Sequence, residues 1–171
     1  SNYSSLQWSS SGSGVLFNFN SLNAVYIPST ADINSGIVEL TLTAYPEDPC
    51  LMVVSESMLL KIQRLPFISI YNDINICESN SVQLLAQAQN SSGIQWSTSG
   101  DGTFNVLSLN FAVYYPGAQD IIIGEVDVTA VASAISPCTS SVFDVKHISI
   151  QKLPQVDAGD DETICEVNSY E

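Results

Sequence analysis

The sequence WSTSGDGTFNVLSLNFAVYYPG, residues 96–117, occurs a second time in the chain in a diverged form. The related stretch, WSSSGSGVLFNFNSLNAVYIPS, begins at residue 8, so the two copies are related by a shift of 88 positions. The same shift relates Pro49-Cys50 to Pro137-Cys138, and ICESNS (76–81) to ICEVNS (164–169). A register that holds over nearly the whole chain identifies a tandem repeat.

The repeat predicts an array of domains rather than one domain of 171 residues. We assign residues 1–65 to a repeat that lacks its N-terminal part, and residues 66–153 to a complete repeat. Residues 154–171 then correspond to the first strands of a third repeat. We interpret the chain as a window on a longer polypeptide, so its lack of a targeting segment carries no information on localisation.

Within each unit, apolar residues alternate with polar ones over short segments that turn-forming residues separate. Residues 37–44 (IVELTLTA) and 125–133 (EVDVTAVAS) show the pattern most clearly. Period-two alternation is typical of half-buried β-strands, and no segment has a convincing helical period. We therefore predict an all-β fold of tandem antiparallel β-sandwiches, with Greek-key connections and about 88 residues per repeat.

Two aromatic residues recur in each unit and are the expected markers of its core. Trp8 corresponds to Trp96, and Tyr26 corresponds to Tyr114. We expect each Trp to fill the space between the two sheets, and each Tyr to pack beside it with its hydroxyl group hydrogen-bonded at the rim. Stacking of these rings on a ligand is the less favoured interpretation.

The chain is strongly acidic, with 18 Asp and Glu residues against four Lys and Arg residues and a formal net charge of −14. So few basic side chains cannot neutralise many phosphates, which argues against nucleic acid and anionic membrane surfaces as partners. The charge favours solubility and repulsion between neighbouring molecules. No apolar run reaches the roughly 18 residues of a membrane span, so we expect no direct membrane insertion.

The four cysteines also follow the repeat, since Cys50 corresponds to Cys138 and Cys77 to Cys165. Two cysteines per repeat predict structural disulfides and an oxidising compartment. The arrangement that we favour joins Cys77 to Cys138 within the complete unit, and leaves Cys50 and Cys165 to pair outside this window. The alternative arrangement joins neighbouring units through Cys50–Cys77 and Cys138–Cys165.

Loops rich in Gly and Asp suggest two kinds of local chemistry. The SGDG loop holds Asp101 where the other copy has Ser13, so a turn is favoured over a metal site: Gly would supply a positive φ, and Asp or Ser would bond the local backbone. Asp32 and Asp120 recur, and we interpret them as Asx turns.

The weak calcium candidates are Asp157, Asp160 and Asp161 in DAGDDE, because Ca²⁺ prefers several carboxylate oxygens.

No grouping of residues in the sequence predicts catalysis. We find no Ser, Cys and His set, no G-x-S-x-G motif, and no carboxylate pair with a basic partner that both copies share. His147, the single histidine, corresponds to Leu59 in the other copy, which favours an edge-strand position over a general base. We therefore expect no enzymatic activity and no cofactor other than the weakly indicated calcium.

Two stretches resemble known extracellular repeats. PQVDAGDDETICEVNSY (154–170) resembles the opening of PKD-like and Ig-like repeats, and WSTSGDGTF with YYPGAQDI and GEVDVTAVA resembles their body in giant secreted adhesins of Bacteroidota. These include adhesins of gliding bacteria that are exported by type IX secretion. The resemblance covers nearly the whole chain, although Ser79 and Val167 replace the usual Gly after ICE, and residues 66–78 lack the usual A-G. It implies gliding motility, cell adhesion and filament formation.

The leading functional hypothesis is a structural and adhesive segment of a long filament at the bacterial cell surface. The expected partners are neighbouring repeats of the same chain, surface polysaccharides or other cell-surface proteins. Short linkers, RLP (64–66) and KLP (152–154), would stiffen the array because Pro fixes its own φ and restricts the preceding residue. The alternatives are a carbohydrate- or protein-binding module, for which Phe111 and Tyr115 are the candidate contacts, and a spacer in a secreted enzyme.

Overall fold

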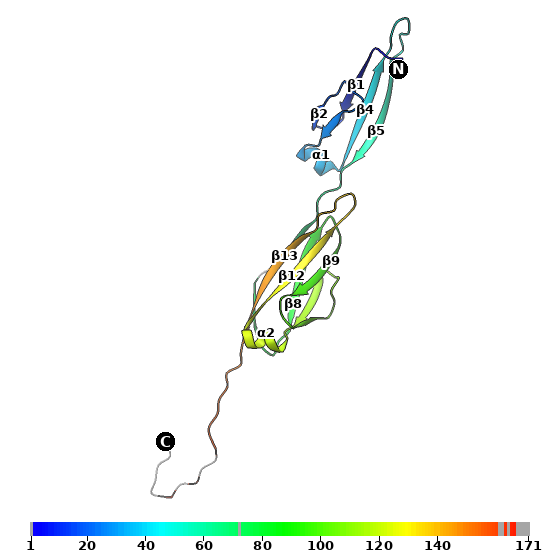
Figure 1. Cartoon of the computed structure of the whole chain (residues 1–171). Helices are drawn as coiled ribbons and strands as arrows, with labels where there is room; N and C mark the ends of the chain where they lie inside the picture. The colour runs from blue at the N-terminus through cyan, green and yellow to red at the C-terminus, as the bar shows by residue number, and fades with distance from the viewer. Residues whose placement is uncertain (1, 72, 161–162, 164, 167–171) are drawn as a thin grey trace.

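A computed structural model describes residues 2–71, 73–160, 163, 165 and 166. Two β-rich units follow one another along the chain and lie end to end in Figure 1, joined by a short extended segment. The described residues form mainly strands, together with two short helices. The prediction of an all-β sandwich fold is confirmed.

The second unit is a sandwich of two four-stranded sheets. One sheet has the order β10-β11-β8-β6 and the other the order β7-β13-β12-β9. Alternate residues of the long strands face the space between the sheets, as the period-two pattern predicts. The strands are β6 (Phe67–Ile70), β7 (Ile74–Cys77), β8 (Val82–Gln89), β9 (Ser91–Thr98), β10 (Thr103–Phe104), β11 (Phe111–Tyr115), β12 (Glu125–Ala134) and β13 (Val142–Gln151).

One strand pair departs from the antiparallel arrangement that the sequence predicts. β7 runs parallel to β13, with Ile74 opposite Ile148 and Cys77 opposite Gln151. The reason is that the chain crosses from one sheet to the other between β6 and β7. β6 and β7 therefore run in the same direction but belong to opposite layers. β7 pairs with β13 only over Ile148–Gln151, so His147 has a strand partner in β12 alone among the described residues.

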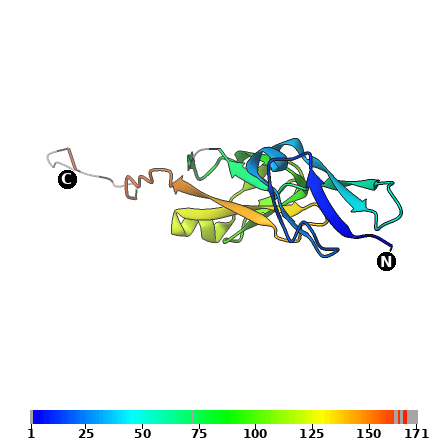
Figure 2. The ribbon, with the colours of Figure 1, turned by 90° about the horizontal axis from the view of Figure 1, so that it is seen from above.

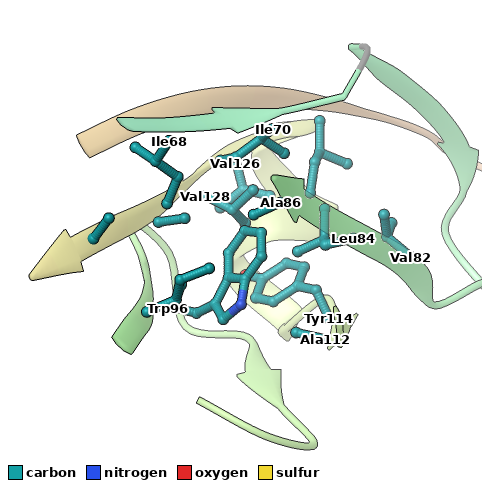
Figure 3. Packing of buried hydrophobic residues seen from close by; sticks show 14 of the residues in the cluster. Ile68, Ile70, Val82, Leu84, Ala86, Trp96, Ala112, Tyr114, Val126 and Val128 are labelled. Atoms are coloured by element: carbon teal, nitrogen blue, oxygen red, sulfur yellow. The ribbon is translucent and has the colours of Figure 1, made fainter. Parts of the chain in front are cut away.

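The core of the second unit lies between the two sheets around Trp96 and Tyr114. Trp96 is 2% exposed and Tyr114 is fully buried. Figure 3 shows the two rings side by side, with aliphatic side chains of both sheets around them. The Phe104 ring lies 4.9 Å from the Tyr114 ring and 6.2 Å from the Trp96 ring, measured between centroids. Large aromatic side chains in such contacts contribute much of a small domain's stability.

The first unit contains the counterparts of β9 to β13. Its sheets have the orders β1-β4-β5 and β2-β3, and its described residues include no counterpart of β6, β7 or β8. Trp8 and Tyr26 are therefore only half-buried, because no strand like β8 covers them. The strands are β1 (Ser5–Ser10), β2 (Val15–Phe17), β3 (Val25–Ile27), β4 (Ile37–Tyr45) and β5 (Val54–Lys61).

Each unit also has a short helix that the sequence analysis did not predict. α1 (Thr30–Ser35) and α2 (Ala118–Ile123) each contain six residues, which is too short for a helical period to emerge in the sequence. Each helix ends at a Gly in the left-handed region, Gly36 with φ 75° and Gly124 with φ 90°. α2 lies at the end of the unit from which the C-terminal segment leaves (Figures 1 and 2).

Among the described residues that follow Gln151, no strand is formed. Within the same described part of the chain, no helix has the length and apolar character to cross a membrane.

Candidate functional site: a buried tyrosine–aspartate clamp

The most specific polar arrangement in each unit is a buried Asp that ties a helix to the Gly-rich loop. In the second unit this clamp consists of Tyr114, Asp120 and the loop 100–102. Asp120 is 1% exposed, and its Oδ2 accepts hydrogen bonds from the Tyr114 hydroxyl group at 2.5 Å and the Gly117 amide at 2.9 Å. The Gly102 amide donates to Oδ2 at 3.2 Å, and the Asp101 amide donates to Oδ1 at 3.2 Å. Four donors thus offset the cost of burying the carboxylate.

The first unit repeats the clamp with Tyr26, Asp32 and the loop 12–14. Asp32 is 4% exposed and accepts the Tyr26 hydroxyl group at 2.7 Å and the Ser29 amide at 2.8 Å on Oδ2. The Ser13 amide donates to Oδ1 at 2.9 Å. The fourth bond differs, because the Gly14 amide donates to the Tyr26 hydroxyl group at 3.0 Å instead of to the Asp carboxylate. The recurrence of the other three bonds in two diverged copies shows that each repeat builds the clamp from its own residues.

The protonation states of the clamp suit a permanent hydrogen bond. Burial raises the pKa of the Asp32 carboxyl group, but hydrogen bonds from the Ser29 amide and the Tyr26 hydroxyl group lower it more, to well below its usual range. Burial and the hydrogen bond to Asp120 raise the pKa of Tyr114 to about 12. The Tyr114 hydroxyl group therefore stays protonated at neutral pH and remains the donor of its hydrogen bond to Asp120.

The glycines of the loop are required by close approach rather than by backbone conformation. A Cβ atom at Gly100 would overlap the Asp120 carboxylate, and one at Gly102 would overlap the Tyr114 ring and lie 2.5 Å from the Tyr115 carbonyl oxygen. Neither glycine has a positive φ, so the prediction that they supply one is wrong. The loop recurs as G-x-G because the clamp leaves no room for a side chain at either position.

The difference between GDG and GSG follows from how each helix is capped. In the second unit, both carboxylate oxygens of Asp101 accept the Gln119 amide at 3.1 Å, and Oδ1 accepts the Asp120 amide at 3.2 Å. The N-cap residue itself is Gly117, and a Cβ atom there would overlap the Asp101 side chain. Asp101 therefore caps α2 from the neighbouring loop, a role that the turn interpretation did not include.

The first unit caps α1 with Ser29 instead, and Ser13 is hydrogen-bonded to that cap. Ser29 is the N-cap, and its hydroxyl oxygen accepts the Asp32 amide at 3.2 Å. Ser13, which replaces Asp101, lies 2.7 Å from Ser29 between their Oγ atoms. The pairs Asp101 with Gly117 and Ser13 with Ser29 are thus two solutions to one capping problem.

The calcium candidates lie in the C-terminal segment. Asp157 Oδ1 accepts the Gly159 amide at 2.9 Å, which closes a local turn. Asp160 is exposed, and Asp161 lies outside the described residues. Within the described ranges, no group of three or more His, Cys, Asp or Glu residues is placed to hold a metal ion. Calcium binding here stays a prediction.

Neither disulfide arrangement considered from the sequence is formed in this structure, where all four described cysteines are free thiols. Cys77 lies beside Gln151 at the end of β13, whereas Cys138 precedes the start of β13. A ten-residue strand spans roughly 30 Å, and a disulfide needs Cα atoms within about 7 Å. The alternative pairings also join separated points. Cys50 lies in the hairpin of the first unit, whereas Cys77 lies at the far end of the second unit. Cys138 lies in the hairpin of the second unit, whereas Cys165 belongs to the C-terminal segment that leaves the opposite end.

Three further residues singled out in the sequence lie on the surface. His147 Nδ1 lies 2.9 Å from Asp127 Oδ1, and this hydrogen bond raises the histidine pKa. Phe111 and Tyr115 on β11 are 44% and 49% exposed and point away from the core. The structure does not bring these residues together with the clamp.

Comparison with known proteins gives a likeness in architecture alone. No family model and no curated protein matches the chain. A solved structure of protocadherin gamma B2 extracellular cadherin domains 3–6 matches with a TM-score of 0.44 and 13% identity, over 85% of this chain and 40% of that chain. Protocadherin gammaB7 EC3-6 gives 0.46 and 12%, over 88% and 43% of the two chains. Mouse protocadherin-24 EC1-3 gives 0.40 and 10%, over 86% and 58%.

The chain therefore spans about two fifths of the length of the first of these structures. At identities of 10–13% and TM-scores of 0.40–0.46, these matches assign no family and no role to the chain.

Replacement of Asp120 by Asn tests the clamp. The amide cannot accept from four donors, and its own N–H group faces them, so we expect the free energy of unfolding of the second unit to fall by about 3 kcal/mol. Urea unfolding followed by circular dichroism measures the change. The control is Asp127→Asn, which removes only an exposed bond to His147 and should have little effect. Equal effects of the two variants would contradict a structural role for Asp120.

Exchange of the two capping solutions tests the link between Asp101 and Gly117. Asp101→Ser removes the cap of α2, and Gly117→Ser introduces a side chain that overlaps Asp101, so each single change should lower the unfolding midpoint. The double variant recreates the pair Ser13 and Ser29, and we expect it to be more stable than the sum of the single changes implies. Additive effects in this thermal-unfolding cycle would refute the link.

The pH dependence of stability tests the charge of the Asp101 cap. Hydrogen bonds from the Gln119 and Asp120 amides lower the pKa of Asp101 below its unfolded value of about 3.9. The ionised cap then stabilises the fold above that pH, and its contribution is lost as the pH falls through the folded pKa. We expect Asp101→Asn to be less stable than the natural chain at pH 6, and the gap to close below about pH 4. A gap that is independent of pH would show that charge plays no part.

Proposed function

We propose that this chain is a stiff, non-enzymatic spacer segment of a long extracellular filament that serves adhesion at a bacterial cell surface. The observation that carries the proposal is the junction between the two units, where side chains of both units fasten the connecting segment. The resemblance to gliding-motility adhesins, together with the acidic repeats, supports the bacterial surface, the type IX export route and the adhesive role. Neighbouring repeats and surface polysaccharides or proteins are the proposed partners.

The first unit holds the connecting segment through Arg64. Its Nη2 atom donates to the Asn34 carbonyl oxygen at 2.7 Å and to Asn34 Oδ1 at 3.0 Å, and its Nε atom donates to the Ile33 carbonyl oxygen at 3.1 Å. The Ile62 amide donates to the Gly36 carbonyl oxygen at 2.9 Å. The end of β5 and the end of α1 are therefore joined to the residues that leave the unit.

The second unit holds the same segment from the other side. Asn90 Nδ2 donates to the Leu65 carbonyl oxygen at 3.3 Å, and the Cys138 thiol group lies 3.4 Å from the Gln63 carbonyl oxygen. Pro66 follows directly and restricts the backbone of Leu65 to extended conformations. A connection that is bonded on both sides transmits force and orientation between units, which a flexible linker would not do.

The tyrosine–aspartate clamp supports the same role. It joins the strand β11, the G-x-G loop and α2, and it lies at the end of the unit that meets the next junction (Figure 1). The corresponding helix of the first unit, α1, accepts the hydrogen bond from Arg64. A rigid helix end is therefore part of the surface on which the connecting segment is fixed.

Small-angle X-ray scattering tests the stiff junction. We expect the natural chain to give a narrow distribution of extended dimensions. Insertion of Gly-Ser-Gly between Leu65 and Pro66 should broaden the distribution, and Arg64→Ala should broaden it less. The control is Lys152→Ala, which alters the corresponding position beyond the second unit. A natural chain as variable as the insertion variant would refute the spacer function.

A further inference from the structure

We infer that each junction in this array carries a disulfide between the hairpin cysteine of one unit, Cys138 in the second unit, and the counterpart of Cys77 in the unit before it. This pairing differs from every arrangement considered from the sequence. It concerns covalent chemistry and holds whether or not the array is adhesive. The inference rests on two cysteine positions that converge on a single backbone carbonyl group.

The first observation places Cys138 at the junction. The cysteine lies in the connection between β12 and β13, and its thiol group is 3.4 Å from the Gln63 carbonyl oxygen and 3.9 Å from that of Arg64. Both carbonyl groups belong to the segment that leaves the first unit. The hairpin of one unit thus touches the final residues of the preceding unit.

The second observation places the counterpart of Cys77 at the same point. Within the second unit, Cys77 lies directly opposite Gln151, and the Glu78 amide donates to the Gln151 carbonyl oxygen at 3.0 Å. Gln151 is the repeat counterpart of Gln63. A β7 strand in the first unit would therefore set its cysteine beside Gln63, on the strand next to β5, at a spacing of about 4.8 Å.

The two cysteines consequently approach the Gln63 carbonyl group from different units. The described residues of the first unit contain no counterpart of β7, so Cys138 has no thiol to meet in this chain. The repeat supplies one wherever a complete unit precedes another. Both Cys77 and Cys138 are partly exposed, which leaves their sulfur atoms open to a small oxidant.

The linkage forms by thiol–disulfide exchange with a small-molecule disulfide. One cysteine thiolate attacks a sulfur atom of that disulfide and releases one small thiol. The second cysteine thiolate then attacks the protein sulfur of the mixed disulfide and releases the other small thiol. The two cysteines are oxidised, the small disulfide is reduced to two thiols, and the two cysteine protons are taken up by the released thiolates.

The test completes the first unit. The full chain is extended by a copy of residues 66–88 ahead of Ser1, which continues the repeat register because Ser1 corresponds to Gln89. After incubation with oxidised glutathione, free thiols are alkylated and the digest is mapped without reduction. We expect a cross-link between the added copy of Cys77 and Cys138, with loss of alkylation at Cys138.

Matched variants show whether the cross-link is specific. Cys138→Ser should leave the added cysteine without a cross-link, either as a free thiol or as a mixed disulfide with glutathione. Cys50→Ser should leave the cross-link intact, and the unextended chain should show no cross-link at Cys138. Docking of the added strands is followed separately by iodide quenching of Trp8 in a Trp96→Phe background, because a covered Trp8 is shielded. Docked strands with a free Cys138, or a link from Cys138 to another cysteine, would overturn the inference.

A second variant decides the matter if the added strands fail to dock. Gln63→Cys in the unextended chain places a thiol at the point where the two cysteines are inferred to converge. A cross-link between residues 63 and 138 would support the inference. Its absence under the same oxidation would overturn it, because Cys138 would then not face the end of the preceding unit.

Discussion

A buried Asp that accepts a hydrogen bond from a Tyr hydroxyl group organises one end of each unit. Asp120 draws its four donors from the strand β11, the Gly-rich loop and the start of α2. A buried carboxylate is costly unless its hydrogen-bonding capacity is used, so the position of each donor is fixed closely. The glycines of the loop, the short helix and the cap by Asp101 are all consequences of that requirement.

The diverged copies reveal which parts of this arrangement are fixed and which can vary. The Tyr, the Asp and the two glycines are the same in both units. A side chain at either glycine would overlap the Tyr or the Asp, and loss of the Asp carboxylate would leave buried donors unsatisfied. The cap of the helix varies, since helix N–H groups can donate either to the Asp101 carboxylate or to the Ser29 hydroxyl group, which is hydrogen-bonded to Ser13. The cap can vary because several side chains can accept from the same donors.

The clamp also connects the interior of a unit to its junction. It fixes a helix, the helix of the first unit accepts the hydrogen bonds of Arg64, and Arg64 belongs to the segment that leads to the next unit. Polar contacts from the second unit reach the same segment through Asn90 and Cys138. Hydrogen bonds from the helix end of the first unit and from side chains of the second unit thus meet at the segment that connects the two units.

The sequence by itself determined the repeat, the β-sandwich class and the buried faces of strands such as β4 and β12, because period-two alternation and an 88-residue register are properties of sequence order. It could not yield the six-residue helices, which are shorter than the span that a helical period needs, or the parallel β7, which depends on a change of sheet.

Only the tertiary structure decided the roles of Asp101, Asp120 and the cysteines. Asp101 and Asp120 are 19 positions apart, and an isolated Asp beside Gly predicts a turn unless the helix that it caps is already in place. The positions of Cys77 and Cys138 depend on which end of a sandwich each hairpin reaches. That is set by the path of the chain through two sheets, a long-range property that the local pattern of residues does not contain.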